Sequence, residues 1–286
     1  LESIYHGPSD GSLVGYWSFD DAPGSELVDL SGNSHHGDIN GAEWSNDVPI
    51  PGCSDPLASN HVEGSNTEIN CLYNDIEGEW YVAVDGDDTY NDGSEGSPFA
   101  TIGHIIGQIG PDGGGIIHVG EGTFYENLSI IDKHNLSIIG QGPEHTIIDG
   151  GNVDRVFELE GFWSDHHNIS ISDLSIVNGS IEDAPGGGIY AYGINLLIDN
   201  LIITDNHATS GYNAGAIHVG NSDILIRNCL IYNNDNAGDE WSDNGGLRIG
   251  QGNGQIENST IVGNEAINIY IDYGAVLNVV NSIIEI

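Results

Sequence analysis

Carboxylates, aromatic rings and histidines, the side chains best suited to holding or cleaving a sugar, gather in the second half of the chain. The richest segments are NGSIEDAPGG, NHATSGYNAG and NDNAGDEWSDNGG. Aromatic rings stack on the apolar faces of sugars, and acidic groups bond to sugar hydroxyls. From these segments and the strands that adjoin them we predict a glycan-binding face, built from Tyr190, Tyr192, Tyr212, His218 and Trp241. A solvated acidic face with scattered aromatic residues is the alternative.

The same segments could hold a catalytic site, because glycoside hydrolysis needs only two carboxyl groups that flank the bond. If the protein is an enzyme, we expect its catalytic residues to be Asp183, Asp235, Asp239 and Arg248. Acidic residues are frequent throughout the chain, however, and no catalytic constellation can be recognised among them. We therefore favour a module without turnover, with a polysaccharide hydrolase or lyase as the alternative.

Oxygen ligands for a hard cation cluster in the glycine-rich segment DGDDTYNDGS, as Asp85, Asp87, Asp88 and Asp92. Calcium is bound by such carboxylates, but the segment lacks the spacing of an EF-hand. A structural turn is the interpretation that we prefer, and a calcium site is the alternative. We expect no organic cofactor.

The three cysteines have different surroundings. Cys53 and Cys71 bracket a Pro-, Gly- and Asn-rich stretch with few apolar residues, where a disulfide would replace missing burial, and we predict that they pair. Cys229 lies in the strand-like segment ILIRNCLIY without metal-ligating neighbours, which indicates a small buried core residue.

The charge balance excludes some partners. The chain has 44 acidic residues and four basic ones, which gives a formal net charge of -40. Nucleic acids and anionic membranes both require basic contacts, so we exclude them as partners. No apolar run approaches the roughly 18 residues that cross a bilayer. This composition favours a secreted or cell-surface protein of a marine or salt-adapted bacterium.

The elements that position these residues are repeats. Similar segments, each an apolar alternation, a polar residue and a second alternation, begin at Asn168, Asn195, Asp223, Gly254 and Leu277. The polar position recurs at spacings of 27, 28, 30 and 23 residues, as Asp173, Asn200, Asn228, Asn258 and Asn281. A period of this size indicates a solenoid, and short strands with turn glycines favour a parallel β-helix. We interpret the five residues as an inward amide ladder at a sharp corner.

An amphipathic segment precedes the repeats. SPFATIGHIIGQIG places Ser97 as an N-cap, Pro98 at the first helical position, and Phe99, Ile102, Ile105, Ile106 and Ile109 at helical spacing. We predict a helix that closes the N-terminal end of the solenoid. No such segment follows the last repeat, so we expect either that the chain continues or that another copy covers this end.

Two stretches resemble known families. WYVAVDGDDTYNDGSEGSPFATIGHII, followed by IIHVGEGTFYENLSI and LSIIGQGPEHTIIDGG, looks like the opening of the pectate-lyase-like superfamily of right-handed β-helices. Near the N-terminus, LVGYWSFDDAPGSELVDLSGNSHHGDINGAEW resembles the last strands of a laminin G-like, concanavalin-like jelly roll. The first resemblance implies the fold but no single function, because this scaffold hosts lyases, hydrolases, adhesins and inert repeats.

The expected organisation is therefore a partial laminin G-like segment over 1–48, a cysteine-bracketed linker over 49–78, and an all-β, right-handed parallel β-helix over 79–286. The function that we expect is a rigid structural or adhesive module that contacts polysaccharide or cell-surface glycans. A subunit of an extracellular filament or sheet, joined through the open C-terminal coil, is a further alternative.

Overall fold

The computed structural model describes residues 26–29, 32–38, 51–52, 67–68, 78–109, 113–161, 167–209, 214–236, 245–265, 267–272 and 274–285. They fall into two units, 1–72 and 73–286. In the first unit, β1 (Glu26–Leu27) pairs antiparallel with β2 (Gly37–Asp38), and β3 (Pro51–Gly52) pairs parallel with β4 (Thr67–Glu68). Most of the predicted laminin G-like segment, and both Cys53 and Cys71, lie outside the described residues.

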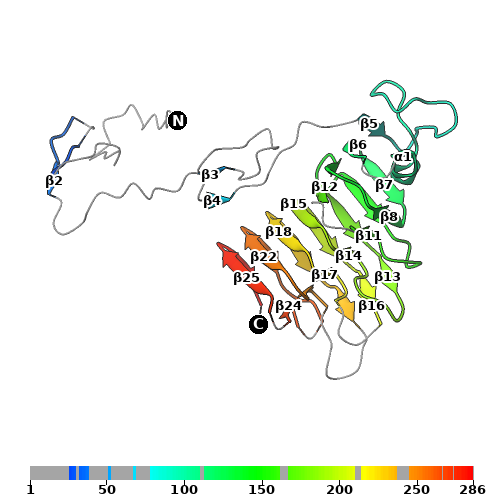
Figure 1. Ribbon diagram of the computed structural model, residues 1–286. Helices are drawn as coiled ribbons and strands as arrows, with labels where there is room; N and C mark the ends of the chain where they lie inside the picture. The colour runs from blue at the N-terminus through cyan, green and yellow to red at the C-terminus, as the bar shows by residue number, and fades with distance from the viewer. Residues whose placement is uncertain are drawn as a thin grey trace. The chain divides into compact units, whose positions relative to one another are not determined.

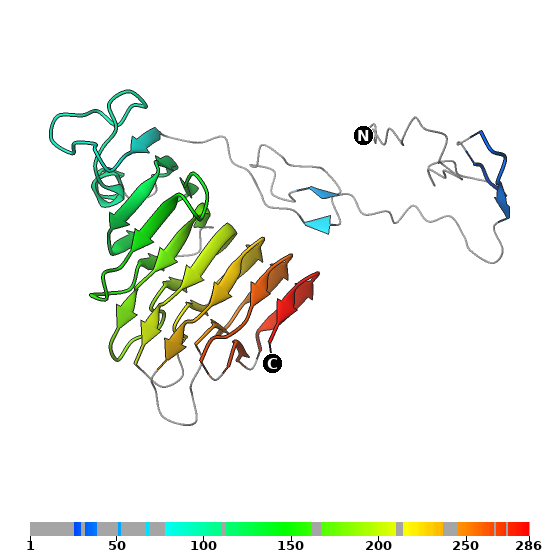
Figure 2. The ribbon, with the colours of Figure 1, turned by 180° about the vertical axis from the view of Figure 1, so that it is seen from behind.

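The second unit is a right-handed parallel β-helix, as predicted. Successive coils stack side by side in chain order from β5 to β25 (Figure 1). Figure 2 shows the same order from behind. The register follows the sequence repeat, since Asn168 pairs with Asn195 and Asn195 with Asp223.

Three parallel sheets form the walls of the coils. The main sheet comprises β5 (Glu79–Val82), β6 (Gly115–Val119), β7 (Gly122–Tyr125), β9 (Leu136–Ile139), β10 (Thr146–Asp149), β12 (Asn168–Val177), β15 (Asn195–Thr204), β18 (Asp223–Arg227), β19 (Leu230–Tyr232), β22 (Asn253–Glu257), β23 (Thr260–Ile261), β25 (Val276–Val280) and β26 (Ile283–Ile284). The second sheet comprises β8 (Leu128–Ile131), β11 (Phe157–Glu160), β14 (Ile189–Tyr192), β17 (Ile217–Gly220), β21 (Leu247–Ile249) and β24 (Ile269–Ile271). The short-strand sheet comprises β13 (Ser180–Ile181), β16 (His207–Ala208) and β20 (Asp235–Asn236).

Alternating apolar residues fill the interior, and β12 illustrates how one strand serves two walls. Ile169 and Ile171 are buried before the corner, and Leu174 and Ile176 after it. The inward alternation is interrupted at Asp173, which has a left-handed φ of 58°. The extra residue turns the chain, so that both halves of the strand direct their apolar side chains inward.

The five predicted ladder residues occupy this corner, but not with inward side chains. All have φ values between 48° and 58°, a conformation that Asn and Asp tolerate better than other residues with a side chain. Their side chains are half-buried at Asp173 and Asn200 and exposed at Asn228, Asn258 and Asn281. Asn200 does donate to Asp173 across one coil, at 2.7 Å. The recurring residue therefore serves the backbone turn, and the inward amides lie elsewhere in the coil.

The predicted cap helix is present, but it begins later than expected. Helix α1 spans Ile102–Gln108, with Thr101 as its N-cap, and packs against β6 and β8. Ser97 and Pro98 precede it in extended chain, because Phe99 forms a parallel bridge with Val82. Phe99 and the four predicted isoleucines are buried, which confirms the apolar face of the segment.

At the other end, the main sheet finishes with β25 and β26, whose Val276 and Ile283 are 60% and 65% exposed. Self-association through this coil stays a prediction. Among the described residues, no helix is long and apolar enough to span a membrane.

Candidate functional site

A three-residue unit recurs at the second corner of each coil and builds the first candidate surface. Its first residue has a left-handed φ, its second is a buried Asn, and its third points outward. Three coils carry the full unit, as Asp205-Asn206-His207, Asn233-Asn234-Asp235 and Gly263-Asn264-Glu265. The first residue reverses the chain, the second fixes the corner, and the third presents a functional group to solvent.

The buried Asn residues form the amide ladder that the sequence analysis assigned to the other corner. Asn206 and Asn234 are each 1% exposed, and Asn264 is 7% exposed. The Nδ2 of each donates to the Oδ1 of the next, at 3.0 Å from Asn206 to Asn234 and 2.8 Å from Asn234 to Asn264. Each Oδ1 also accepts a backbone N–H of the preceding coil. This ladder fixes the row of outward residues beside it.

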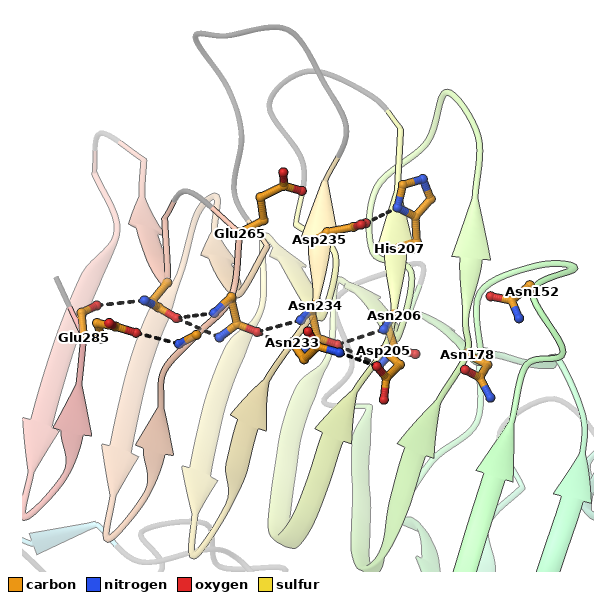
Figure 3. A pocket seen from close by; sticks show the side chains of 13 residues that line it. Asn152, Asn178, Asp205, Asn206, His207, Asn233, Asn234, Asp235, Glu265 and Glu285 are labelled. Atoms are coloured by element: carbon orange, nitrogen blue, oxygen red, sulfur yellow. Dashed lines mark hydrogen bonds and ion pairs between the residues drawn. The ribbon is translucent and has the colours of Figure 1, made fainter.

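An acidic groove of about 860 Å³ opens over this corner (Figure 3). Its lining includes the carboxylates Asp205, Asp235, Glu265 and Glu285, together with His207. His207 Nδ1 and the carboxylate of Asp235 are hydrogen-bonded across neighbouring coils, and Figure 3 shows the two side chains directed toward each other.

Other groups in the groove are held by similar contacts. Asn233 donates to the carboxylate of Asp205, and Glu285 accepts the backbone N–H of Gly263 at 2.6 Å. Glu265 projects into the groove from the last of the three units (Figure 3). The groove thus offers several acceptors and one imidazole along consecutive coils.

A second candidate surface lies on the outward face of the second sheet. Tyr190 pairs in register with His218, His218 with Arg248, and Arg248 with Tyr270, so one side chain from each of four coils forms an aromatic row. The rings of Tyr190 and His218 lie 5.9 Å apart, tilted by 38°. Such rows of rings and polar donors are suited to an extended chain of sugars.

Two of the chain's four basic residues support the aromatic row. The guanidinium of Arg155 lies 4.8 Å from the centroid of the Tyr190 ring, and that of Arg248 lies 5.2 Å from the centroid of Tyr270. Arg248 also makes a bidentate ion pair with Asp272, with N–O distances from 2.8 to 3.0 Å. The cation–π contacts order the two rings, and the ion pair with Asp272 neutralises the charge of Arg248.

At this surface, the pKa values of three side chains are shifted toward the neutral form. Burial, with a smaller contribution from Arg248, lowers the pKa of His218 to about 4, so the imidazole is uncharged at neutral pH. Burial also raises the pKa of the Tyr190 hydroxyl, and burial followed by the charge of Glu158 raises the pKa of the nearby Glu160. His218 Nδ1 is buried without a hydrogen-bond partner.

The predicted face is therefore divided between two sheets. Tyr190, Tyr192 and His218 belong to the second sheet, where Tyr192 is 41% exposed. Asp235 lies in the short-strand sheet, whereas Arg248 lies in the second sheet, so the structure does not bring this proposed catalytic pair together. Asp183 is exposed in the loop after β13. Tyr212, Asp239 and Trp241 lie outside the described residues.

Three of the four carboxylates proposed for calcium accept hydrogen bonds from turns and from the start of a helix. Asp87 accepts the N–H groups of Thr89 and Tyr90, and Asp92 accepts from Ser94. Asp85 is exposed.

Asp88 accepts three hydrogen bonds from the start of α1, namely the N–H groups of Ala100 and Thr101 and the Thr101 hydroxyl. Burial alone would raise the pKa of Asp88, but these hydrogen bonds outweigh it and lower the pKa. Across the part of the chain that the structure describes, no group of three or more His, Cys, Asp or Glu side chains is arranged to hold a metal ion. The contacts of Asp87, Asp88 and Asp92 are those of turns and a helix start, and the calcium alternative stays a prediction.

Several residues of the two candidate surfaces were not predicted from the sequence. Arg155, Tyr270 and Asp272 complete the aromatic row, and Glu265 and Glu285 complete the groove. A signal for the groove was available, since Asn206, Asn234 and Asn264 recur at spacings of 28 and 30 residues. Three outward residues of the groove, His207, Asp235 and Glu265, directly follow these Asn residues.

No protein-family model matches the sequence, and no curated protein matches it. Among solved structures, the chain is similar to a rhamnogalacturonan lyase at 16% identity and a TM-score of 0.45, over 71% of this chain and 56% of that one. A pectin methylesterase from carrot matches at 14% identity and a TM-score of 0.35, over 71% of this chain and 82% of that one. Pectin methylesterase PemA from Erwinia chrysanthemi matches at 13% identity and a TM-score of 0.32, over 64% and 69%. The chain spans little more than half the length of the lyase, and at these values the likeness assigns no activity to it.

Proposed function

We propose that the protein is an extracellular glycan-binding module that presents the aromatic row of its β-helix to a polysaccharide and binds it there without cleaving it. The observation that carries this proposal is the in-register placement of Tyr190, His218, Arg248 and Tyr270 on four consecutive coils. Coils of a parallel β-helix repeat at about 4.8 Å. A rigid row at this spacing can contact several sugars of one chain at once.

The chemistry of the row fits a sugar ligand. His218, uncharged at neutral pH, adds a neutral ring beside Tyr190. The ring of Tyr190 is ordered by its contacts with Arg155 and His218, and Tyr192, 41% exposed, presents a second ring from the same strand. Binding at Tyr190 then costs little side-chain entropy, since this ring is already ordered.

Isothermal titration calorimetry against a panel of neutral and acidic polysaccharides tests the proposal. We expect binding to at least one member, and an affinity loss of about tenfold in Tyr190→Ala, which corresponds to about 1.4 kcal/mol. Tyr125→Ala is the matched control, because Tyr125 is 75% exposed on β7 of the main sheet. If no polysaccharide of the panel binds, the proposed glycan-binding function is wrong.

A polysaccharide hydrolase is the second candidate, and the acidic groove favours it. Asp205, Asp235, Glu265 and Glu285 line one groove, and glycoside hydrolysis needs two carboxyl groups on opposite sides of the bond. The experiment is to measure new reducing ends from the same panel, in calcium and in chelator. Turnover that survives both Asp235→Asn and Glu265→Gln would exclude the groove as its site.

The wider setting is also part of the proposal. The net charge of -40 fits a secreted chain in salty surroundings, and the laminin G-like motif of 1–48 fits an adhesive protein with several modules. A calcium requirement would be detected by repeating the titration after chelation.

A further inference from the structure

A serine, a histidine and an aspartate stand next to one another on three consecutive coils. In the short-strand sheet, Ser180 of β13 pairs in register with His207 of β16, and His207 pairs with Asp235 of β20. The residues that follow His207 and Asp235, Ala208 and Asn236, are each 0% exposed and point inward. Because side chains alternate along a strand, the serine, histidine and aspartate share the outward face.

The orientation of the His207 imidazole decides which edge of its ring faces Ser180. His207 Nδ1 is hydrogen-bonded to Asp235 Oδ1. Nδ1 and Cδ2 lie on opposite edges of the ring, so a ring with Nδ1 toward Asp235 turns its Cδ2–Nε2 edge toward the other neighbour, Ser180. Adjacent strands lie about 4.8 Å apart, which brings a serine hydroxyl within reach of Nε2 through side-chain rotation.

The protonation pattern follows from the same contact. A carboxylate accepts the proton of Nδ1–H, which leaves Nε2 as the basic nitrogen. Side-chain exposure is 31% for His207 and 47% for Asp235, and Ser180 is half-buried. All three groups are therefore open to a substrate.

The buried amide ladder fixes the three residues from behind. The residue before each of them belongs to this ladder: Gly179 donates its N–H to Asn206 Oδ1 at 2.9 Å, and Asn206 donates its N–H to Asn234 Oδ1 at 3.0 Å. A constellation on fixed strands keeps its geometry better than one on loops.

We propose that Ser180, His207 and Asp235 form a nucleophilic triad that hydrolyses carboxylic esters of uncharged acyl groups. Ser180 Oγ attacks the ester carbonyl carbon while its proton passes to His207 Nε2. The C–O bond to the alcohol then breaks, and the alcohol leaves with that proton. Water, deprotonated by the same nitrogen, attacks the acyl-serine, the proton returns to Ser180, and a carboxylic acid is released.

The surroundings set the substrate class. The backbone N–H of Asn152 donates to the carbonyl of Asn178, two residues before Ser180, and Asn152 lines the adjoining groove. We expect its side-chain amide to be the donor for the oxyanion. The carboxylates of Asp205 and Glu265 in the same groove repel anionic substrates and the acid product. Neutral esters, such as acetyl groups on sugar hydroxyls, are not repelled by these negative charges. This activity is independent of glycan binding at the aromatic row.

Two measurements on the intact chain test the triad. A fluorophosphonate probe followed by peptide mass spectrometry reports whether Ser180 is an activated nucleophile, and p-nitrophenyl acetate reports turnover. We expect the probe on Ser180, and a turnover at least about 100-fold lower in Ser180→Ala and in His207→Gln. Ser170→Ala is the matched control, since Ser170 lies on β12 and its hydroxyl donates to Ser137 rather than to a histidine.

Unfolding curves of each variant show that the fold is kept, so that lost activity is not lost structure. Three outcomes would overturn the proposal: an unlabelled Ser180, labelling that persists in His207→Gln, or turnover that persists in Ser180→Ala.

Discussion

Asn206 donates a hydrogen bond from its side-chain Nδ2 to the Oδ1 of Asn234, at 3.0 Å, inside the stack of coils. Both side chains are 1% exposed, and each also donates to main-chain carbonyls that water does not reach. This pair links the interior of the fold to its surface, because the next residues along the chain are His207 and Asp235. Stability and candidate chemistry therefore depend on the same buried amides.

Replacing Asn234 by Ala should be among the most damaging polar substitutions. The change removes donors to Ile203 O and Tyr232 O and an acceptor for Asn206. Buried groups left without partners cost about 1–3 kcal/mol each, so we expect the free energy of unfolding to fall by roughly 2–4 kcal/mol. Urea denaturation measures it. Asn253→Ala is the control, because Asn253 is exposed; equal losses in the two variants would contradict a buried role for Asn234.

The corner at Asn200 should discriminate between Gly and Ala. Both substitutions remove the donor to Asp173, but only Ala places a Cβ at a φ of 52°. A left-handed residue with a Cβ costs about 1–2 kcal/mol, so Asn200→Ala should be about 1 kcal/mol less stable than Asn200→Gly. Denaturation midpoints of the two variants check this. An Ala variant as stable as the Gly variant would show that the corner relaxes.

Helix α1 should depend on the hydroxyl of Thr101. This hydroxyl accepts the N–H of His104 at 3.2 Å and donates to Asp88 Oδ2 at 2.7 Å. Thr101→Ala should lower the free energy of unfolding by about 1–2 kcal/mol, and Thr101→Ser should restore most of it. If Ser and Ala are equally destabilised in thermal or urea unfolding, the methyl group rather than the cap is what matters.

His218 should make the protein less stable in mild acid. Its pKa is about 4 in the fold, against an ordinary value of 6.5, so between these pH values the unfolded chain binds a proton that the folded chain does not. Stability from this group is therefore lost as the pH falls from about 6.5 toward 4, by roughly 2–3 kcal/mol in total.

The difference between wild type and His218→Gln isolates this effect from the titration of the many carboxylates. Urea unfolding at pH 7 and at pH 4.5 should show a larger loss for the wild type than for the variant. Equal losses would mean that the imidazole is solvated enough to be protonated in place.

The thiols should separate into two classes. Cys229 is 3% exposed, and burial raises the pKa of its thiol to about 12, so it should resist alkylation in the native protein and react in denaturant. If Cys53 and Cys71 form the predicted disulfide, one thiol per chain reacts in denaturant without reductant, and three react after reduction. Three reactive thiols before reduction would exclude the disulfide.

The sequence by itself determined the period of the repeat, the fold class and which apolar residues form the core. Asp173, Asn200 and Asn228 mark each turn of the chain because Asn and Asp accept a left-handed backbone, and the apolar alternation around them requires stacking for burial. It also located the cap helix, although the contacts of Asp88 and the bridge from Phe99 to Val82 move the helix start to Ile102.

Only the tertiary structure decided which Asn residues point inward and which side chains meet. Asn228 and Asn234 belong to series with the same period, so spacing cannot distinguish an exposed corner residue from a buried ladder residue. The assignment depends on the direction in which each short strand leaves its turn. In the same way, the pairing of His207 with Asp235, and the separation of Asp235 from Arg248, depend on which of three sheets each residue joins. That is a property of coils in register, which no single repeat of the sequence contains.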